Sequence, residues 1–126
     1  MVLVDTSVWI RFLTGTEPFA TGLDELLARD EVAGHEMVFG ELLIGDRGGR
    51  VKLLAAYSQM YQAPIVPHGD VAEFVRSRKL HGRGVGWVDV HVLASAVVGD
   101  LQLWTAHPRF ATIAAELQVA HRLGTS

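Results

Sequence analysis

Cysteine is absent from this sequence of 126 residues. Its absence excludes a disulfide framework and any thiolate metal site, and it permits a reducing intracellular environment. Long apolar runs are absent as well. The stretch from Val90 to Val98 is interrupted by His91 and Ser95, and it has about half of the roughly 20 residues that span a bilayer. We therefore expect no membrane segment.

The N-terminus has no positively charged stretch, and its first apolar run meets Asp5 after three residues. A secretory signal peptide is not expected from this pattern, and we predict a cytoplasmic protein. Positive charge is not in excess, since 11 basic residues stand against 14 acidic ones for a net charge of −3. The chain thus lacks the field of a tight nonspecific duplex binder, although a local basic strip could still hold RNA.

Apolar residues make up 49% of the chain, which predicts one compact domain over residues 1–126. Short strands are predicted at 2–4, 31–34, 64–67, 102–105 and 119–121. Helices are predicted at 8–13 with Ser7 as N-cap, at 22–29, 35–44, 50–60, 70–80 and 88–98, and from Pro108 onward. This alternation favours a three-layer α/β/α domain with a central, mainly parallel sheet. In such folds sites gather at the carboxyl ends of strands, where Asp5 and Thr105 fall.

Three acids stand where burial would otherwise penalise them. Asp5 follows an apolar strand, Glu41 lies within the apolar stretch 37–44, and Asp89 opens the most apolar helix. Each has a structural explanation on its own, because Asp5 and Asp89 could cap helices and Glu41 could face water. An unpartnered buried carboxylate costs several kcal/mol, however, so a cation, an arginine or backbone donors must stand near each one that is buried.

Together the three acids form a less ordinary arrangement. Carboxylates that converge without nitrogen or sulfur ligands suit Mg²⁺ or Mn²⁺. Such an ion can activate a water and offset charge on a phosphodiester as it is cleaved.

The ordered set of motifs resembles the PIN domains, and among them VapC-like toxins of type II toxin–antitoxin systems. The resemblance covers essentially the whole chain. Its motifs are Asp5-Thr6-Ser7 after the first strand, Glu41 in an apolar helix, Gly86-Trp87-Val88-Asp89 before the helix with His91 to Ala96, and Leu103-Trp104-Thr105.

The resemblance implies an endoribonuclease that uses Mg²⁺ or Mn²⁺ and is silenced by a VapB-like antitoxin. Asp5 and Asp89 would then be metal ligands, Glu41 the third acid, and Thr6 and Thr105 supporting hydroxyls. It also implies a homodimer. The first helix, with Trp9 and Phe12, is a candidate surface for either partner, although core packing explains the same residues.

One position departs from the family pattern. An acid commonly lies two residues after the threonine that closes the late strand, and here that residue is His107. An imidazole binds Mn²⁺ better than Mg²⁺ and removes one negative charge, so we expect weaker occupancy of any second metal position. Alternatively, His107 only precedes the Pro108 helix and faces water.

Contacts to RNA are predicted around the glycine loop 82–86. A dense basic cluster would suit RNA phosphates, although a solvated helix end explains it too. Trp87 could stack on an unpaired base or could pack against the domain. His91 and Ser95 on the buried helix are expected to make core contacts, as are Trp9 and Trp104. The basic cluster comprises Arg76, Arg78, Lys79, His81 and Arg83.

Two other functions compete with the nuclease. An Asp at the end of the first strand could be a nucleophile, as in aspartyl-phosphate phosphatases, but those have a second Asp two residues on, where this chain has Ser7. The His107 departure instead motivates a PIN-like domain that binds RNA or a partner without cutting.

Overall fold

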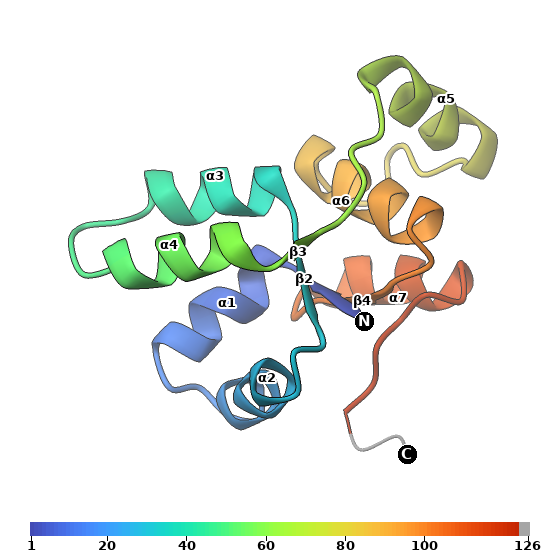
Figure 1. Ribbon diagram of the computed structural model, residues 1–126. Helices are drawn as coiled ribbons and strands as arrows, with labels where there is room; N and C mark the ends of the chain where they lie inside the picture. Colours follow the sequence, from blue (N-terminus) through green and yellow to red (C-terminus); the bar gives the residue numbers. More distant parts are fainter. Residues whose placement is uncertain (124–126) are drawn as a thin grey trace.

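The computed structural model describes residues 1–123, and a four-stranded parallel sheet lies at its centre (Figure 1). The strands stand in the order β3-β2-β1-β4, and each neighbouring pair is parallel. β1 is central because its three apolar residues are all buried, with Leu3 paired to Ala33 on one side and Leu103 on the other. The predicted parallel sheet is confirmed. The strands are β1 (Val2–Val4), β2 (Val32–Gly34), β3 (Tyr61–Gln62) and β4 (Gln102–Trp104).

Seven helices surround the sheet within the described residues. Each predicted helix is present, and its ends match the prediction or differ from it by at most three residues. The helices are α1 (Thr6–Leu13), α2 (Phe19–Ala28), α3 (Glu36–Ile44), α4 (Val51–Gln59), α5 (His68–Arg78), α6 (Trp87–Val98) and α7 (Pro108–Glu116). Helices on both sides of the sheet give the three-layer α/β/α arrangement that the alternating pattern predicted.

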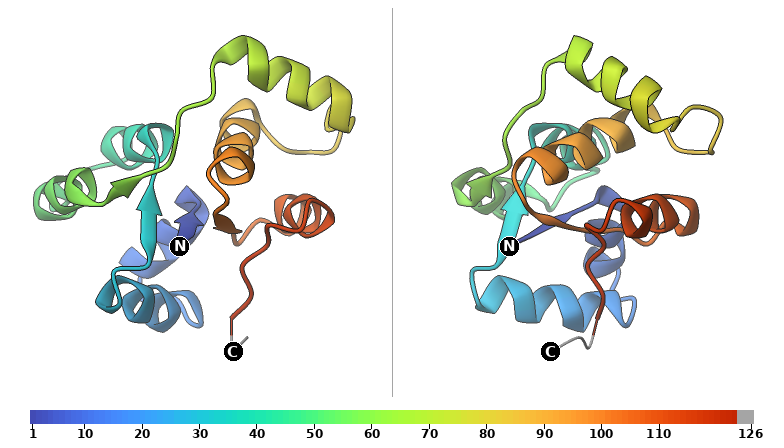
Figure 2. Two further views of the ribbon diagram at one scale, coloured as in Figure 1. Left: turned by 45° about the vertical axis from the view of Figure 1, so that its right-hand side comes forward. Right: turned by 90° about the vertical axis from the view of Figure 1, so that its right-hand side faces the viewer.

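The most apolar helix, α6, lies between the sheet and α5. Figure 2 shows α5 as an outer helix on the far side of α6 from the strands. Residues 90–96 of α6 are all buried, which explains why the sequence is apolar around the whole helix rather than along one face. None of the helices in residues 1–123 is long and apolar enough to cross a membrane.

Two strand predictions need correction. The strand expected at 64–67 is instead β3 at Tyr61–Gln62. Pro64 and Pro67 have no N–H to contribute to a ladder, so the chain pairs before the first proline. The strand expected at 119–121 is reduced to a single bridge between Ala120 and Leu103.

The start of α1 also differs from the expectation. Asp5, and not Ser7, occupies the N-cap position, and its side chain makes no capping bond to the helix. Ser7 lies inside the first turn. Trp9 is fully buried in the core and Phe12 is partly buried, so Trp9 is packed within the domain and cannot serve as a partner surface.

Candidate active site

Asp5 is held at the carboxyl end of the central strand, where α1 begins. Its side chain is only 5% exposed, so it needs donors or a cation to offset the lost hydration. The Oδ2 oxygen accepts hydrogen bonds from Ser7 Oγ at 2.7 Å and from Thr105 Oγ1 at 2.9 Å. Both donors thus serve one carboxylate oxygen, and together they fix its direction.

Ser7 and Thr105 also tie the ends of two strands together. Ser7 Oγ accepts a hydrogen bond from the Ala106 backbone N–H at 3.0 Å, and Thr105 Oγ1 accepts one from the His107 N–H at 3.1 Å. The two hydroxyl oxygens lie 3.2 Å apart. Each hydroxyl has one hydrogen, and both hydrogens point to Asp5 in this arrangement.

Ser7 is therefore a site residue that sequence reasoning missed. Its signal was the spacing of two residues from Asp5, which lets a hydroxyl reach back to a preceding carboxylate. Ser7 also accepts the hydrogen bond from the Ala106 N–H, and the two residues are 99 positions apart. No local sequence pattern could predict that contact.

Glu41 is connected to the start of α1 through Thr6. Thr6 Oγ1 donates a hydrogen bond of 2.6 Å to Glu41 Oε1. Because Thr6 directly follows Asp5, this bond brings the α3 acid next to the end of β1. Glu41 itself is exposed, as expected for a polar residue on a helix with one buried face.

Asp89 lies half-buried in the first turn of α6, and the Gly86 N–H donates to its Oδ2 at 2.9 Å. The pKa of Asp89 is raised above its ordinary value. Burial is the largest cause and the nearby charge of Asp5 adds to it, whereas the Gly86 hydrogen bond and the nearby His107 act to lower the pKa. Two acids far apart in the sequence, one after β1 and one in α6, are therefore close enough to repel each other.

The donor chemistry of these acids suits a hard divalent cation. Within residues 1–123, no three histidine or acidic side chains form a group that could hold a metal ion. The arrangement instead offers Asp5 and Asp89 as a pair, with Glu41 turned toward Thr6. A pair fits Mg²⁺, which keeps several of its waters and binds through one or two carboxylates. Ligation by all three acids stays a prediction.

His107 has a structural task in addition to its place near Asp89. It is the N-cap of α7, and its Nδ1 accepts a hydrogen bond from the Phe110 N–H at 3.2 Å. It precedes the Pro108 helix, as the alternative interpretation predicted, but its side chain is partly buried rather than facing water. His107 also acts to lower the pKa of Asp89, so the ring lies near the acid pair while its Nδ1 is occupied.

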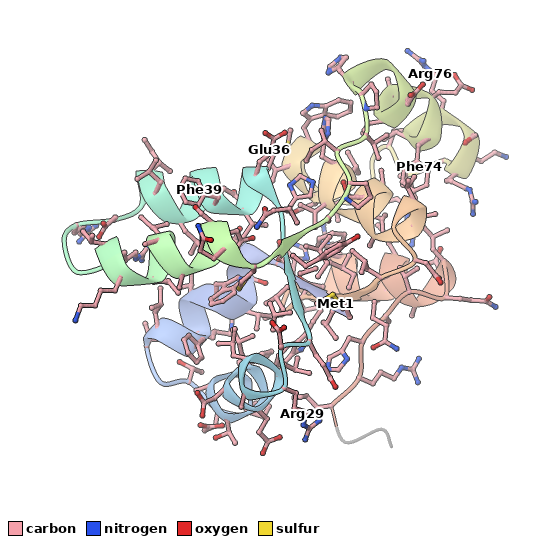
Figure 3. The ribbon with its side chains drawn as sticks, in the orientation of Figure 1. Met1, Arg29, Glu36, Phe39, Phe74 and Arg76 are labelled. Carbon is pink, nitrogen blue, oxygen red and sulfur yellow. The ribbon has the colours of Figure 1, made fainter. Side chains whose placement is uncertain are left out.

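Three residues of the predicted basic cluster have partners within the domain. Arg83 forms a double hydrogen bond with Glu116 of α7, at 2.8 and 2.6 Å, and this pair ties the glycine loop to that helix. Arg76 lies 3.6 Å from Glu73, and Figure 3 shows it on the outer side of α5, away from α6. Arg78 lies over the Phe74 ring. Contacts from Arg76, Arg78, Lys79 and Arg83 to RNA stay predictions.

The core assignments on α6 and β4 are confirmed. Ser95 Oγ lies 2.9 Å from Nε2 of the buried His35, and Trp104 is buried on β4. Trp87 differs, because 43% of its surface remains exposed. It contacts the ring of His91 and also that of His68, a residue that sequence reasoning did not single out.

A cavity of about 620 Å³ opens at the other edge of the sheet. It is lined by Val2 and Gln102, the first residues of their strands, and by Glu31. The cavity thus lies at the amino ends of the strands, whereas Asp5 follows the carboxyl end of β1. Ligands of parallel sheets bind at the carboxyl ends, so this cavity is separate from the acid pair.

The fold and the acids define a class of parallel α/β domain with a carboxylate pair at the carboxyl edge of the sheet. The model of the PIN domain family matches residues 2–116. The chain belongs to the PIN domain family, as the resemblance in its motifs implied.

Two ribonucleases of Mycobacterium tuberculosis (strain ATCC 25618 / H37Rv) are similar to this chain. Ribonuclease VapC32 is 42% identical over 121 residues, which cover 95% of each chain. Ribonuclease VapC19 is 31% identical over 123 residues, which cover 94% of this chain and 98% of its own. The crystal structure of FitAcB from Neisseria gonorrhoeae has the same fold, with a TM-score of 0.66, 24% identity and 95% of each chain covered.

Proposed function

We propose that this protein is a metal-dependent endoribonuclease and the toxin of a toxin–antitoxin pair. The observation that supports the proposal is the acid pair: Asp5 lies where β1 ends, Asp89 lies in the first turn of α6, and the charge of Asp5 helps to raise the pKa of Asp89. Two neighbouring carboxylates repel each other, and a bound cation would offset that repulsion. The ribonuclease relatives, similar over nearly the whole chain, support the same activity.

Asp5 and Asp89 are the proposed ligands of one Mg²⁺ or Mn²⁺ ion, with Glu41 as the third acid, directly or through a water. When bound, the ion supplies an activated water and offsets the negative charge that develops on the scissile phosphate. Ser7 and Thr105 keep the Asp5 carboxylate in place through their hydroxyl donors. Thr6 holds Glu41 beside it.

The Gly86 N–H performs the corresponding task for Asp89 by fixing its Oδ2. Because each proposed ligand is oriented by donors from its own chain before the ion arrives, little side-chain freedom has to be lost on binding. We propose that His107 leaves the site with one acid fewer than the family pattern has. The remaining acids would then hold a first metal ion better than a second.

The cleavage assay for this proposal uses labelled structured RNA and purified protein, with Mg²⁺, with Mn²⁺ or with a chelator. We expect cleavage only with metal, and its loss in Asp5→Asn and in Asp89→Asn. Asp24→Asn is the matched control, because Asp24 is an exposed acid of α2. Equal survival of RNA with and without metal, in the unchanged protein, would contradict the proposal.

A second candidate is a PIN-like domain that binds RNA or a partner without cutting it. His107 favours this alternative, since it stands near Asp89 where the family commonly has a further acid. In the same assay a non-cleaving domain would shift the RNA in a binding gel at every metal condition and leave it intact.

The proposal includes the partners and the compartment that such toxins imply. We propose a cytoplasmic homodimer that is silenced by a VapB-like antitoxin. A mass measurement in solution tests the dimer, and co-purification with a small protein encoded by a neighbouring gene tests the complex. A monomer at micromolar concentration would contradict the dimer without affecting the nuclease assay.

A further inference from the structure

The last helix of the described residues, α7, is fixed in the core along its inner face. Phe110, Ile113 and Ala114 are each no more than 1% exposed. The outer face carries two exposed charged residues, Arg109 and Glu116. These two are seven residues apart, so they leave the same face of the helix about two turns from each other. The helix thus presents a charged face from a rigid position.

The start of α7 is tied to Asp5. The Ala106 N–H donates to Ser7 Oγ at 3.0 Å, and that hydroxyl donates to Asp5 Oδ2 at 2.7 Å. The N–H of His107, the N-cap of α7, donates to Thr105 Oγ1, which donates to the same carboxylate oxygen. The position of α7 and the direction of the Asp5 carboxylate therefore depend on each other.

The outer face of α7 is tied to the glycine loop 82–86. Both terminal nitrogens of Arg83 donate to the carboxylate oxygens of Glu116, at 2.8 and 2.6 Å. The next residue, Gly84, has a φ of +82°, and a Cβ at that position would lie only 2.7 Å from Arg109 Cδ. The Arg109 side chain therefore lies directly against the backbone of the loop. Two successive residues of the loop are thus held by one face of α7.

The glycine loop in turn holds Asp89. It ends at Gly86, the N-cap of α6, whose N–H donates to Asp89 Oδ2 at 2.9 Å. Val85, between the two tethered residues and Gly86, packs against the core. The contacts of Arg83 and Gly84 add a connection to α7 that the packing of Val85 does not provide. One helix is therefore linked to Asp5 at its start and to the support of Asp89 along its outer face.

We propose that α7 sets the spacing of Asp5 and Asp89, and that Arg83 and Glu116 are positioning residues of the proposed metal site. The inference rests on the proposed nuclease function, because it concerns the ligands of that site. It gives Arg83 a task other than the RNA contact expected from the sequence. The two parallel hydrogen bonds of an arginine and a carboxylate fix direction as well as distance, which suits a residue that holds a loop.

Charge and position make opposite predictions for the loss of Arg83. Removal of a positive charge leaves the protein more negative, so Coulomb attraction alone would strengthen the binding of a divalent cation. A positioning role predicts weaker binding, because the loop that orients Asp89 is released from α7. Arg83→Lys should also weaken binding, since lysine keeps the charge but cannot form the two parallel hydrogen bonds.

Titration of Mn²⁺ into the RNA-free protein, followed by electron paramagnetic resonance, measures this difference. We expect the affinity to fall about threefold in Arg83→Gln and in Glu116→Gln, less than the roughly tenfold effect of losing a direct partner of a metal ligand. The double variant Arg83→Glu with Glu116→Arg rebuilds the pair with exchanged charges and should regain most of the affinity. Glu73→Gln is the matched control, because Glu73 is an exposed acid whose arginine partner is on its own helix, and it should leave the affinity unchanged.

The order parameter of the Gly86 amide in nuclear magnetic resonance gives a second readout, in protein without metal. It should fall from about 0.85, a rigid backbone, toward about 0.6 in Arg83→Gln and in Glu116→Gln, and it should recover in the double variant. Urea midpoints should stay close to that of the unchanged protein, because an exposed ion pair contributes little to stability. This comparison separates a loosened loop from a destabilised domain.

Equal or tighter Mn²⁺ binding by Arg83→Gln would overturn the positioning proposal, and so would a Gly86 amide that stays rigid in both single variants. Either result leaves the nuclease standing if the unchanged protein binds Mn²⁺ and cuts RNA. If the unchanged protein does neither, the nuclease proposal fails. A Gly86 amide that loosens in both single variants and recovers in the double variant would then still support α7 as the element that positions Asp89.

Discussion

Replacing Ser7 with alanine should disturb both the stability of the domain and the position of Asp5. The hydroxyl donates to Asp5 Oδ2 at 2.7 Å and accepts from the Ala106 N–H at 3.0 Å. A hydrogen bond to a charged group contributes about 1.5–3 kcal/mol, and an orphaned donor costs about 1–3 kcal/mol where water cannot replace the partner. Ala106 is only partly buried, so water offsets some of the second loss. We expect a decrease of about 2–3 kcal/mol in the free energy of unfolding.

Urea unfolding followed by circular dichroism measures this change, because a two-state domain gives the free energy from the midpoint and slope. A double-mutant cycle with Asp5→Ala isolates the interaction. Once the carboxylate is gone, Ser7→Ala should cost at least about 1 kcal/mol less than it does in the unchanged protein. Thr105→Val, which removes the second donor to the same oxygen, should also couple to Ser7→Ala.

A loss below about 0.5 kcal/mol for Ser7→Ala, or fully additive effects in the cycle, would refute this reasoning. Such a result would mean that the hydroxyls do not stabilise the Asp5 carboxylate. The Ser7→Ala protein should also bind Mn²⁺ more weakly, because Asp5 loses one of the groups that direct it.

Two further predictions concern histidines. Burial, with a smaller contribution from His91, lowers the pKa of His35 from 6.5 to about 4. As the pH falls, the His35 imidazole is therefore protonated in the unfolded chain before it is protonated in the folded one. The free energy of unfolding should be highest above about pH 6.5 and should fall as the pH drops toward 4, by no more than about 3 kcal/mol. Urea midpoints that stay level across this pH window, or that fall equally in His35→Asn, would contradict this prediction. His107→Asp should raise Mg²⁺ affinity in calorimetric titration, since it adds an oxygen ligand and a charge near Asp89; an unchanged titration would mean that residue 107 does not face the ion.

The parts of the fold with strong local patterns could be predicted from the sequence. β1 is a continuous apolar run because it is buried between two neighbours, and α6 is apolar all round because it lies between the sheet and α5. The edge strand β3 was misplaced because it has no strong local pattern. Tyr61 and Gln62 are exposed and carry no apolar pattern, whereas Ile65 and Val66 have strand propensity but stand between two prolines.

The residues of the site likewise fall into those with a local sequence signal and those whose contacts are made only in the folded protein. Asp5, Glu41 and Asp89 could be proposed from the sequence because each is an acid within an apolar context. Ser7 could not be assigned, because its role depends on a contact across the fold, the hydrogen bond from the Ala106 N–H. The Arg83 pair with Glu116 is another such contact, and it joins a loop that looked available for RNA to the surface of α7.

The central claim is that Asp5 and Asp89 jointly hold one divalent ion. Titration of Mn²⁺ into the RNA-free protein, followed by electron paramagnetic resonance of the free ion, tests it most directly. We expect about one tight site, with affinity reduced about tenfold or more in Asp5→Asn and in Asp89→Asn, and unchanged in Asp24→Asn. Affinity that is the same in all four proteins would contradict the account.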